Sequence, residues 1–368
     1  MCIRDSFIPL RDLDQYTEDE RVRNDDGTLR VHPKGEFIYR LAGREREKSA
    51  SYYTPEVLTR CLVKYALKEL LEDKSADDIL ELTICEPAMG SAAFLNEAVS
   101  QLAEAYLERK QKETGVSISH EQRQQELQKV KMLIADRNVY GIDLNPTAVE
   151  LAEVSLWLNT IYQGGYVPWF RTQIVNGNSL IGARRQCYTL SQAHNSAPER
   201  VAPGMNRSLR KQQVYHFLLG DPGMCAYTDK VIKGLEPEKI ATIKKWNKNF
   251  TKPLTDSEAD DVLRLCNQID ALWDAHTQLR AEIKDKTTDP LSVWGQAQDE
   301  EHQPTTIRDK DRIYDSLYLS KGGSNASPYA RLKAVMDYWC ALWFWPIDKA
   351  DELPNRMEFL WDVNMLLG

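Results

Sequence analysis

Two short segments of the sequence carry groups that could hold a nucleoside. Glu86, Pro87, Ala88 and Gly90 form a small-residue turn between a predicted strand and a predicted helix. Such a turn lets the backbone approach a ligand closely, and the N-terminus of the following helix favours negative charge. Asp143 ends a second predicted strand, and its carboxylate could accept hydrogen bonds from both hydroxyls of a ribose.

A third segment contains Asn178 and Ser179, whose amide and hydroxyl groups are suited to contacting the edge of an adenine. Each segment also has a purely structural explanation. The turn could be a simple connection, Asp143 could cap the next helix, and Asn178 could be a turn residue. The order and spacing of the three segments together favour ligand binding over three unrelated structural roles.

The spacing of apolar residues predicts the elements that position these segments. A helix is expected to begin with Thr54 as its N-cap and Pro55 as its first residue. Strands are predicted at 79–85, 138–142 and 172–175, and further helices after residue 91, at 121–134 and at 147–162. Alternating strands and helices predict an α/β fold with a parallel sheet, in which ligands bind at the carboxyl ends of the strands.

The rest of the chain divides into segments that differ in composition and in the spacing of apolar residues. Residues 1–6 resemble the translation of a transposon end used to prepare sequencing libraries, so we expect an assembly artefact; the alternative is a genuine start codon. Residues 7–50 are interpreted as an upstream region and linker, and 51–186 as the α/β core. Residues 187–368 are predicted to form a mainly helical insertion or second domain. Within it we predict loops at 187–235, helix at 237–285 and a buried apolar helix at 329–345.

Composition limits the classes of protein to which this chain can belong. The chain has 368 residues, a net charge of −8 and 42 % hydrophobic residues. No apolar run reaches the roughly 20 residues that a membrane span needs. The seven cysteines are scattered without a CxxC pair, which indicates free thiols in a reducing cytoplasm and argues against a metal site. Residues 206–252 carry ten Lys/Arg against four Asp/Glu, a net charge of +6, which indicates either phosphate contact or a solvated helix face.

Four stretches carry a family resemblance: SYYTPEVL (51–58), EPAMGSAAFL (86–95), YGIDLNPTAVELA (140–152) and GNSLIG (177–182). They resemble large DNA adenine-N6 methyltransferases, which occur in type IIG restriction–modification enzymes and in phage-defence systems such as BREX and DISARM. The motif order is similar to the gamma arrangement of that family. The resemblance implies an incomplete S-adenosylmethionine-dependent methyltransferase sheet, which is Rossmann-like, followed by the mainly helical insertion.

The resemblance also implies a role for each site residue. The segment that closes over the methionine end of S-adenosyl-L-methionine corresponds to Tyr53, Thr54 and Pro55. The turn that holds the methionine amino and carboxyl groups corresponds to Glu86, Pro87, Ala88 and Gly90. Asp143 corresponds to the ribose-binding acid, Leu144 lies beside the adenine ring, and Asn178 and Ser179 meet the adenine. Ala92 stands where the family usually has glycine, which could narrow the approach to the cofactor or reflect a different helix start.

Members of this family hold the flipped adenine with an Asn/Asp-Pro-Pro-aromatic segment, and this tetrapeptide does not occur in residues 1–368. No catalytic residue is therefore assigned, and we expect a truncated fragment that is inactive alone, with double-stranded DNA as the substrate of the intact enzyme. Other restriction or defence proteins are expected partners. Two alternatives stay open: a non-catalytic S-adenosylmethionine-binding subunit, and an RNA or protein methyltransferase. The absence of GxGxxG disfavours a nicotinamide dehydrogenase.

Overall fold

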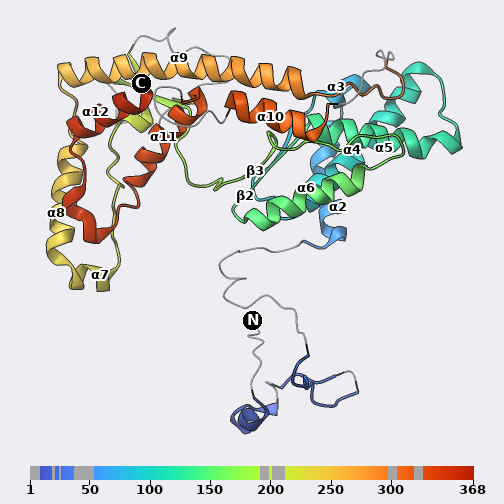
Figure 1. Ribbon diagram of the computed structural model, residues 1–368, viewed down its shortest axis with the longest axis horizontal. Helices are drawn as coiled ribbons and strands as arrows, with labels where there is room; N and C mark the ends of the chain where they lie inside the picture. The colour runs from blue at the N-terminus through green and yellow to red at the C-terminus, as the bar shows by residue number, and fades with distance from the viewer. Residues whose placement is uncertain are drawn as a thin grey trace.

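The computed structural model describes residues 9–18, 21–24, 26–36, 54–190, 199–200, 212–296, 305–318 and 326–368. Tyr53 and residues 1–6 lie outside these described residues. The described chain is a mixed α/β protein that has a small parallel sheet and many helices (Figure 1). Near the N-terminus it has a short 3-10 helix, η1 (Leu10–Gln15), and an isolated bridge between Arg23 and Leu29.

The parallel sheet has the strand order β1-β2-β3, with β1 (Ile84–Glu86), β2 (Val139–Asp143) and β3 (Ile174–Asn176). The first crossover contains two helices, α4 (Ala93–Thr114) and α5 (His120–Arg137), and the second contains α6 (Pro146–Thr160). The predicted alternation of strands and helices is therefore confirmed. Because Glu86 pairs with Gly141 and Asp143 pairs with Asn176, the three strands end at one edge of the sheet.

Local signals explain where these helices begin. The Asn145 side chain accepts a hydrogen bond from the backbone N–H of Thr147, and Pro146 occupies the first turn of α6. The Ser119 side chain accepts from the backbone N–H of Gln122 at the start of α5. These caps fix the points at which the chain leaves a strand or a loop and enters a helix.

Two local predictions are wrong. The strand predicted at 79–85 is shorter, because α3 (Ala76–Leu80) occupies its first part, and a capping box between Ser75 and Asp78 stabilises that helix. Thr54 is not the N-cap of α2 (Glu56–Leu70), and Pro55 precedes the helix instead of starting it. Pro55 is itself the N-cap, with an extended ψ of 141°, so the helix begins one residue later than predicted.

The first hydrophobic core surrounds the parallel sheet. Helices α2 to α6 pack around it, and the long helix α4 supplies many of its side chains. Its largest fully buried side chains include Leu95, Leu102, Tyr106, Ile134 and Leu156. Burial of each such side chain stabilises the fold by about 1.5–3 kcal/mol.

A second sheet follows, which is antiparallel. Its strands are β4 (Gln186–Thr189), β5 (Glu199–Arg200) and β6 (Gln213–Tyr215), in the order β5-β4-β6. We predicted a loop-rich segment and no strand for 187–235, so this sheet corrects that expectation. The pairing of Cys187 with Tyr215 joins residues far apart in the sequence, and no local sequence pattern predicts such a contact.

Helices make up most of the described chain beyond this sheet. Their bounds are η5 (His216–Leu218), α7 (Lys230–Leu235), α8 (Pro237–Phe250), α9 (Asp256–Thr287), α10 (Ile307–Tyr318), α11 (Pro328–Ala341), η7 (Ile347–Glu352) and α12 (Arg356–Leu367). They enclose a second core, to which Phe217, Ile269 and Phe359 contribute fully buried side chains. The apolar helix predicted at 329–345 is mainly α11, and its Val335 is fully buried as expected.

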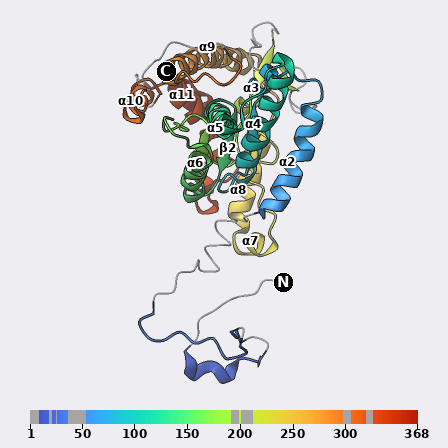
Figure 2. The same cartoon turned by 90° about the vertical axis from the view of Figure 1, so that its right-hand side faces the viewer.

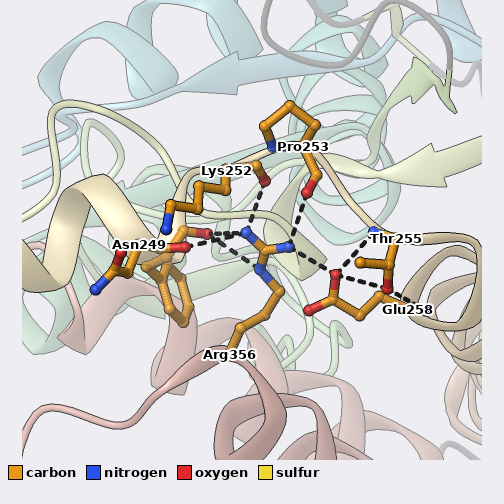
Figure 3. Close-up of polar contacts among 7 residues, drawn as sticks. Asn249, Lys252, Pro253, Thr255, Glu258 and Arg356 are labelled. Carbon is orange, nitrogen blue, oxygen red and sulfur yellow. Dashed lines mark hydrogen bonds and ion pairs between the residues drawn. The ribbon is translucent and has the colours of Figure 1, made fainter.

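Arg356 closes the corner between α8 and α9 (Figure 3). Its guanidinium donates hydrogen bonds to the carbonyl oxygens of Phe250 at 3.1 Å and Pro253 at 3.3 Å, and to the Glu258 carboxylate at 2.9 Å. The last carbonyls of a helix have no partner within that helix. Arg356 therefore satisfies the end of α8 and fixes the first turn of α9 with one side chain.

Helix α9 connects the two cores. Its N-terminal half contributes Leu265 and Ile269 to the second core, and the segment after it places Val293 in the first core. A buried ion pair lies in the segment after α9. Lys310 of α10 contacts the Asp289 carboxylate at 2.6 Å, and Arg137 of α5 donates to the Asp289 carbonyl at 3.1 Å. In Figures 1 and 2, the parallel sheet and the α7–α8 pair lie on the same side of α9. No helix of the described residues is long and apolar enough to cross a membrane.

Candidate functional site

The turn after β1 lies across the end of β2. The backbone N–H of Met89 donates to the carbonyl of Ile142 at 3.1 Å, and the Met89 side chain is buried. A Cβ atom on Gly141 would lie 2.2 Å from the Met89 sulfur, so only glycine leaves room for that side chain over β2. Met89 and Gly141 were not among the predicted site residues, although they place the turn.

Asp143 joins the turn of β1 to the end of β2. One carboxylate oxygen accepts a hydrogen bond from the Gly90 backbone N–H at 2.8 Å, and the other accepts from the Asn145 backbone N–H at 2.8 Å. The structure therefore brings together two of the three predicted segments. A carboxylate has about four lone-pair sites, so it can accept further hydrogen bonds while it holds both amides.

Gly90 faces open space. Its φ is +56°, a conformation that favours glycine, and a Cβ atom built there would meet no atom within 4 Å. A ligand could therefore approach this backbone closely. Ala92 has a φ of 66° and is the N-cap of α4, and its side chain is fully buried. The extra methyl group thus points into the core and does not narrow the approach beside Gly90.

Glu86 is the charged side chain of the turn. It is partly buried, and burial raises the pKa of its carboxyl group, while a hydrogen bond from the Ala88 backbone opposes this effect. A carboxylate that is short of partners in this way is suited to binding a cation. Pro87 and Ala88 are exposed beside it.

The end of β3 is the third strand end at this edge of the sheet. The Gly177 backbone N–H and the Asn176 side-chain amide both donate to the Asp143 carbonyl, at 3.0 Å and 2.9 Å. The Asn178 side-chain oxygen accepts from the backbone N–H groups of Leu180 and Ile181, at 2.9 Å and 3.1 Å. Asn178 thus acts as a turn residue, and its oxygen is directed toward its own loop.

Several side chains of the three loops are exposed. Ser179 is among them, and the apolar side chains of Leu144 and Leu180 are 59 % and 87 % exposed. Exposed leucines beside a carboxylate are suited to an apolar ring that carries polar groups. Asn176, which holds β2 and β3 together at this edge, was missed; its position at a strand end is the only sequence signal for it.

Thr54 and Pro55 lie in front of α2. No hydrogen bond between described residues connects either of them to the three strand ends. The remaining residue of that predicted segment, Tyr53, lies outside the described residues. Among the described residues, no three His, Cys, Asp or Glu side chains are grouped so that they could hold a metal ion. The side chains gathered at this edge are suited to binding an amphipathic ligand.

A comparison with known proteins shows what this region of the chain resembles. Residues 36–181 match the family model described as N-6 DNA Methylase. No curated protein matches the chain. The matched region contains all three strand ends of the parallel sheet. Over these residues the chain is similar to N-6 DNA methylases.

Proposed function

We propose that this chain is the cofactor-binding part of a DNA adenine-N6 methyltransferase and that S-adenosyl-L-methionine binds at the ends of β1, β2 and β3. One observation carries the proposal. Asp143 accepts a hydrogen bond from Gly90 beside open space, so an acid and an accessible glycine turn form one site within the family match. Double-stranded DNA is the proposed substrate of the intact enzyme.

The residues fit the parts of this cofactor. The methionine carboxylate would lie beside the open backbone of Gly90, near the N-terminus of α4, and the cationic amino group would lie beside Glu86. The free lone pairs of Asp143 would accept the ribose hydroxyls, and Leu144 would cover one face of the adenine. When bound, the cofactor supplies a methyl group on a positively charged sulfur.

The remaining predicted residues keep their proposed roles. Pro87 and Ala88 would shape the turn around the methionine end, and Asn178 and Ser179 would meet the adenine edge. Tyr53, Thr54 and Pro55 would close over the methionine end. For Asn178 the side-chain nitrogen would make this contact, because the oxygen already accepts two backbone hydrogen bonds.

We also propose that residues 51–186 form the cofactor-binding core of an S-adenosylmethionine-dependent, Rossmann-like methyltransferase fold. Residues 187–368 would form a second, mainly helical part that begins with the small antiparallel sheet. The tetrapeptide that holds the target base in this family does not occur in residues 1–368, so this chain by itself should not methylate DNA. A restriction or phage-defence system is the proposed context.

Binding of S-adenosylmethionine, measured by calorimetric titration, tests this proposal. Asp143→Ala is a poor probe, because it also removes the acceptor for two backbone amides. Leu144→Ala is better: the side chain is 59 % exposed, so its loss should leave the fold unchanged. Loss of the apolar contact with the adenine should weaken binding about tenfold.

Leu158→Ala is the matched control, since this leucine of α6 is 60 % exposed and belongs to none of the three loops. It should bind the cofactor like the unsubstituted chain. If the folded chain binds no S-adenosylmethionine, or if both leucine variants bind it equally well, the proposed site is wrong.

A further inference from the structure

A hollow of about 270 Å³ lies between α7, α8 and the loop before them. Met224, Ile240 and Ile243 provide an apolar part of its lining. Lys233 from α7, and Lys244 and Lys248 from α8, also border it, and all three lysines are exposed. We call these three residues the lysine rim.

The fold holds this rim in place. Ile240, Lys244 and Lys248 are spaced by four residues and therefore lie on one stripe of α8. The Asn247 side chain donates to the carbonyls of Asp221 and Met224, at 3.2 Å and 3.1 Å, which attaches the preceding loop to the helix. The loop and the helix that line the hollow are thus joined by hydrogen bonds.

The other side of α8 is also fixed. The Trp246 side chain donates to the Pro354 carbonyl at 2.7 Å, and Arg356 binds the last carbonyls of the helix (Figure 3). Lys244 and Lys248 remain exposed on the helix that these contacts hold.

The charged side chains that border the hollow are all lysines. Residues 242–252 contain four lysines and no acidic residue. Acidic side chains lie farther out: Lys239 near the start of α8 forms an ion pair with Asp351, and Asp229 caps α7. None of the lysine rim forms an ion pair with a described residue. Like charges gathered without acidic partners raise the local positive potential and attract anions.

We propose that the lysine rim binds the phosphate backbone of duplex DNA. Lysine contacts a phosphate as a point charge and reads no base sequence, so this surface would position the duplex. The proposal rests on the proposed function, which makes DNA the substrate. Figures 1 and 2 place α7 and α8 on the same side of α9 as the parallel sheet, so one duplex could face both regions.

The test compares two triple variants of the full chain with equal change in charge. The first is Lys233→Gln/Lys244→Gln/Lys248→Gln. The control is Lys68→Gln/Lys112→Gln/Lys284→Gln, which removes three exposed lysines from α2, α4 and α9. Binding of a fluorescein-labelled duplex of about 25 base pairs is followed by anisotropy across a salt series. Cofactor binding is measured on the same samples.

The lysine-rim variant should bind the duplex at least about tenfold more weakly at about 0.1 M salt. The slope of log affinity against log salt should fall in magnitude by about 3, one for each phosphate contact. The control variant should keep the affinity and slope of the unsubstituted chain, and both variants should keep cofactor binding.

Equal DNA binding by the two triple variants overturns the proposal for this surface. So does an unsubstituted chain that binds no duplex, or that binds an RNA hairpin more tightly than the duplex. Retained binding of S-adenosylmethionine in these cases shows that the docking surface has failed while the proposed cofactor site stands.

Discussion

Asp136, near the end of α5, should make the stability of this protein depend on pH. Burial raises the pKa of its carboxyl group to about 6 from an ordinary value of 3.8. Lys310 and Arg137 lower the pKa, the Asp289 carboxylate raises it, and the Tyr166 hydroxyl lowers it, so burial outweighs the favourable charges. The folded protein therefore binds this proton more tightly than the unfolded chain does.

The size of the effect follows from the shift. A pKa raised by about two units corresponds to about 3 kcal/mol in the free energy of unfolding. Because the pKa is raised on folding, this contribution is fully present below about pH 4 and is lost as the pH rises through about 6. Asp136→Asn keeps the shape of the protonated acid and carries no charge at any pH. The variant should match the unsubstituted protein near pH 4 and exceed its stability by up to about 3 kcal/mol near pH 8.

Urea unfolding followed by tryptophan fluorescence, repeated between about pH 4.5 and about pH 8, measures this difference directly. Asp73→Asn removes the same charge from an exposed turn and controls for the change in net charge. A stability difference for Asp136→Asn that is constant across this range would refute the reasoning. An asparagine variant that is less stable near pH 8 would show that Lys310 and Arg137 outweigh burial.

Two further predictions concern other charged side chains. Arg356→Met should lower the free energy of unfolding by about 3 kcal/mol in urea titrations, because the end of α8 and Glu258 lose their partner. The control is Arg264→Met, which removes an exposed arginine that pairs within α9 and should change the free energy of unfolding by less than about 0.5 kcal/mol. Equal losses in the two variants would contradict the role of Arg356. Glu86 should make cofactor binding pH-dependent, since the ionised carboxylate attracts the amino group. Calorimetric affinity should fall as the pH drops from about 7 to about 4.5, while Glu86→Gln should bind more weakly with a flatter profile; identical profiles would exclude Glu86 from the site.

The sequence was most informative where local periodicity is strong. Helices α4 and α6 were predicted because their apolar residues recur at helical spacing over several turns, whereas α5 was predicted as a polar helix. The parallel order followed from the alternation of helices with strands. Asp143 and Gly90 were predicted as members of one site, and the hydrogen bond between them shows that the two segments meet.

Other features of the fold were not predicted from the sequence, for different physical reasons. The capping box of Ser75 and Asp78 is present in the sequence but was not used in the prediction. Ile79 was therefore predicted in a strand, although it lies in α3. A similar box at Asn355 and Glu358 begins α12, which was not predicted. The antiparallel sheet depends on pairing between distant residues, and Gly141 matters only because Met89 lies over it in three dimensions. Such contacts leave no local periodic pattern.

The length of α9 sets a rotation about the helix axis as well as a distance between the parts at its two ends. Its 32 residues span about 48 Å at 1.5 Å per residue, and each residue turns the helix by about 100°. One inserted residue would therefore rotate everything built on the N-terminal half of α9 by more than a quarter turn relative to the parallel sheet. An insertion of seven residues would nearly restore the angle while lengthening the helix by about 10 Å. Related chains that bind a duplex in the same way should accordingly vary this helix in steps close to seven residues.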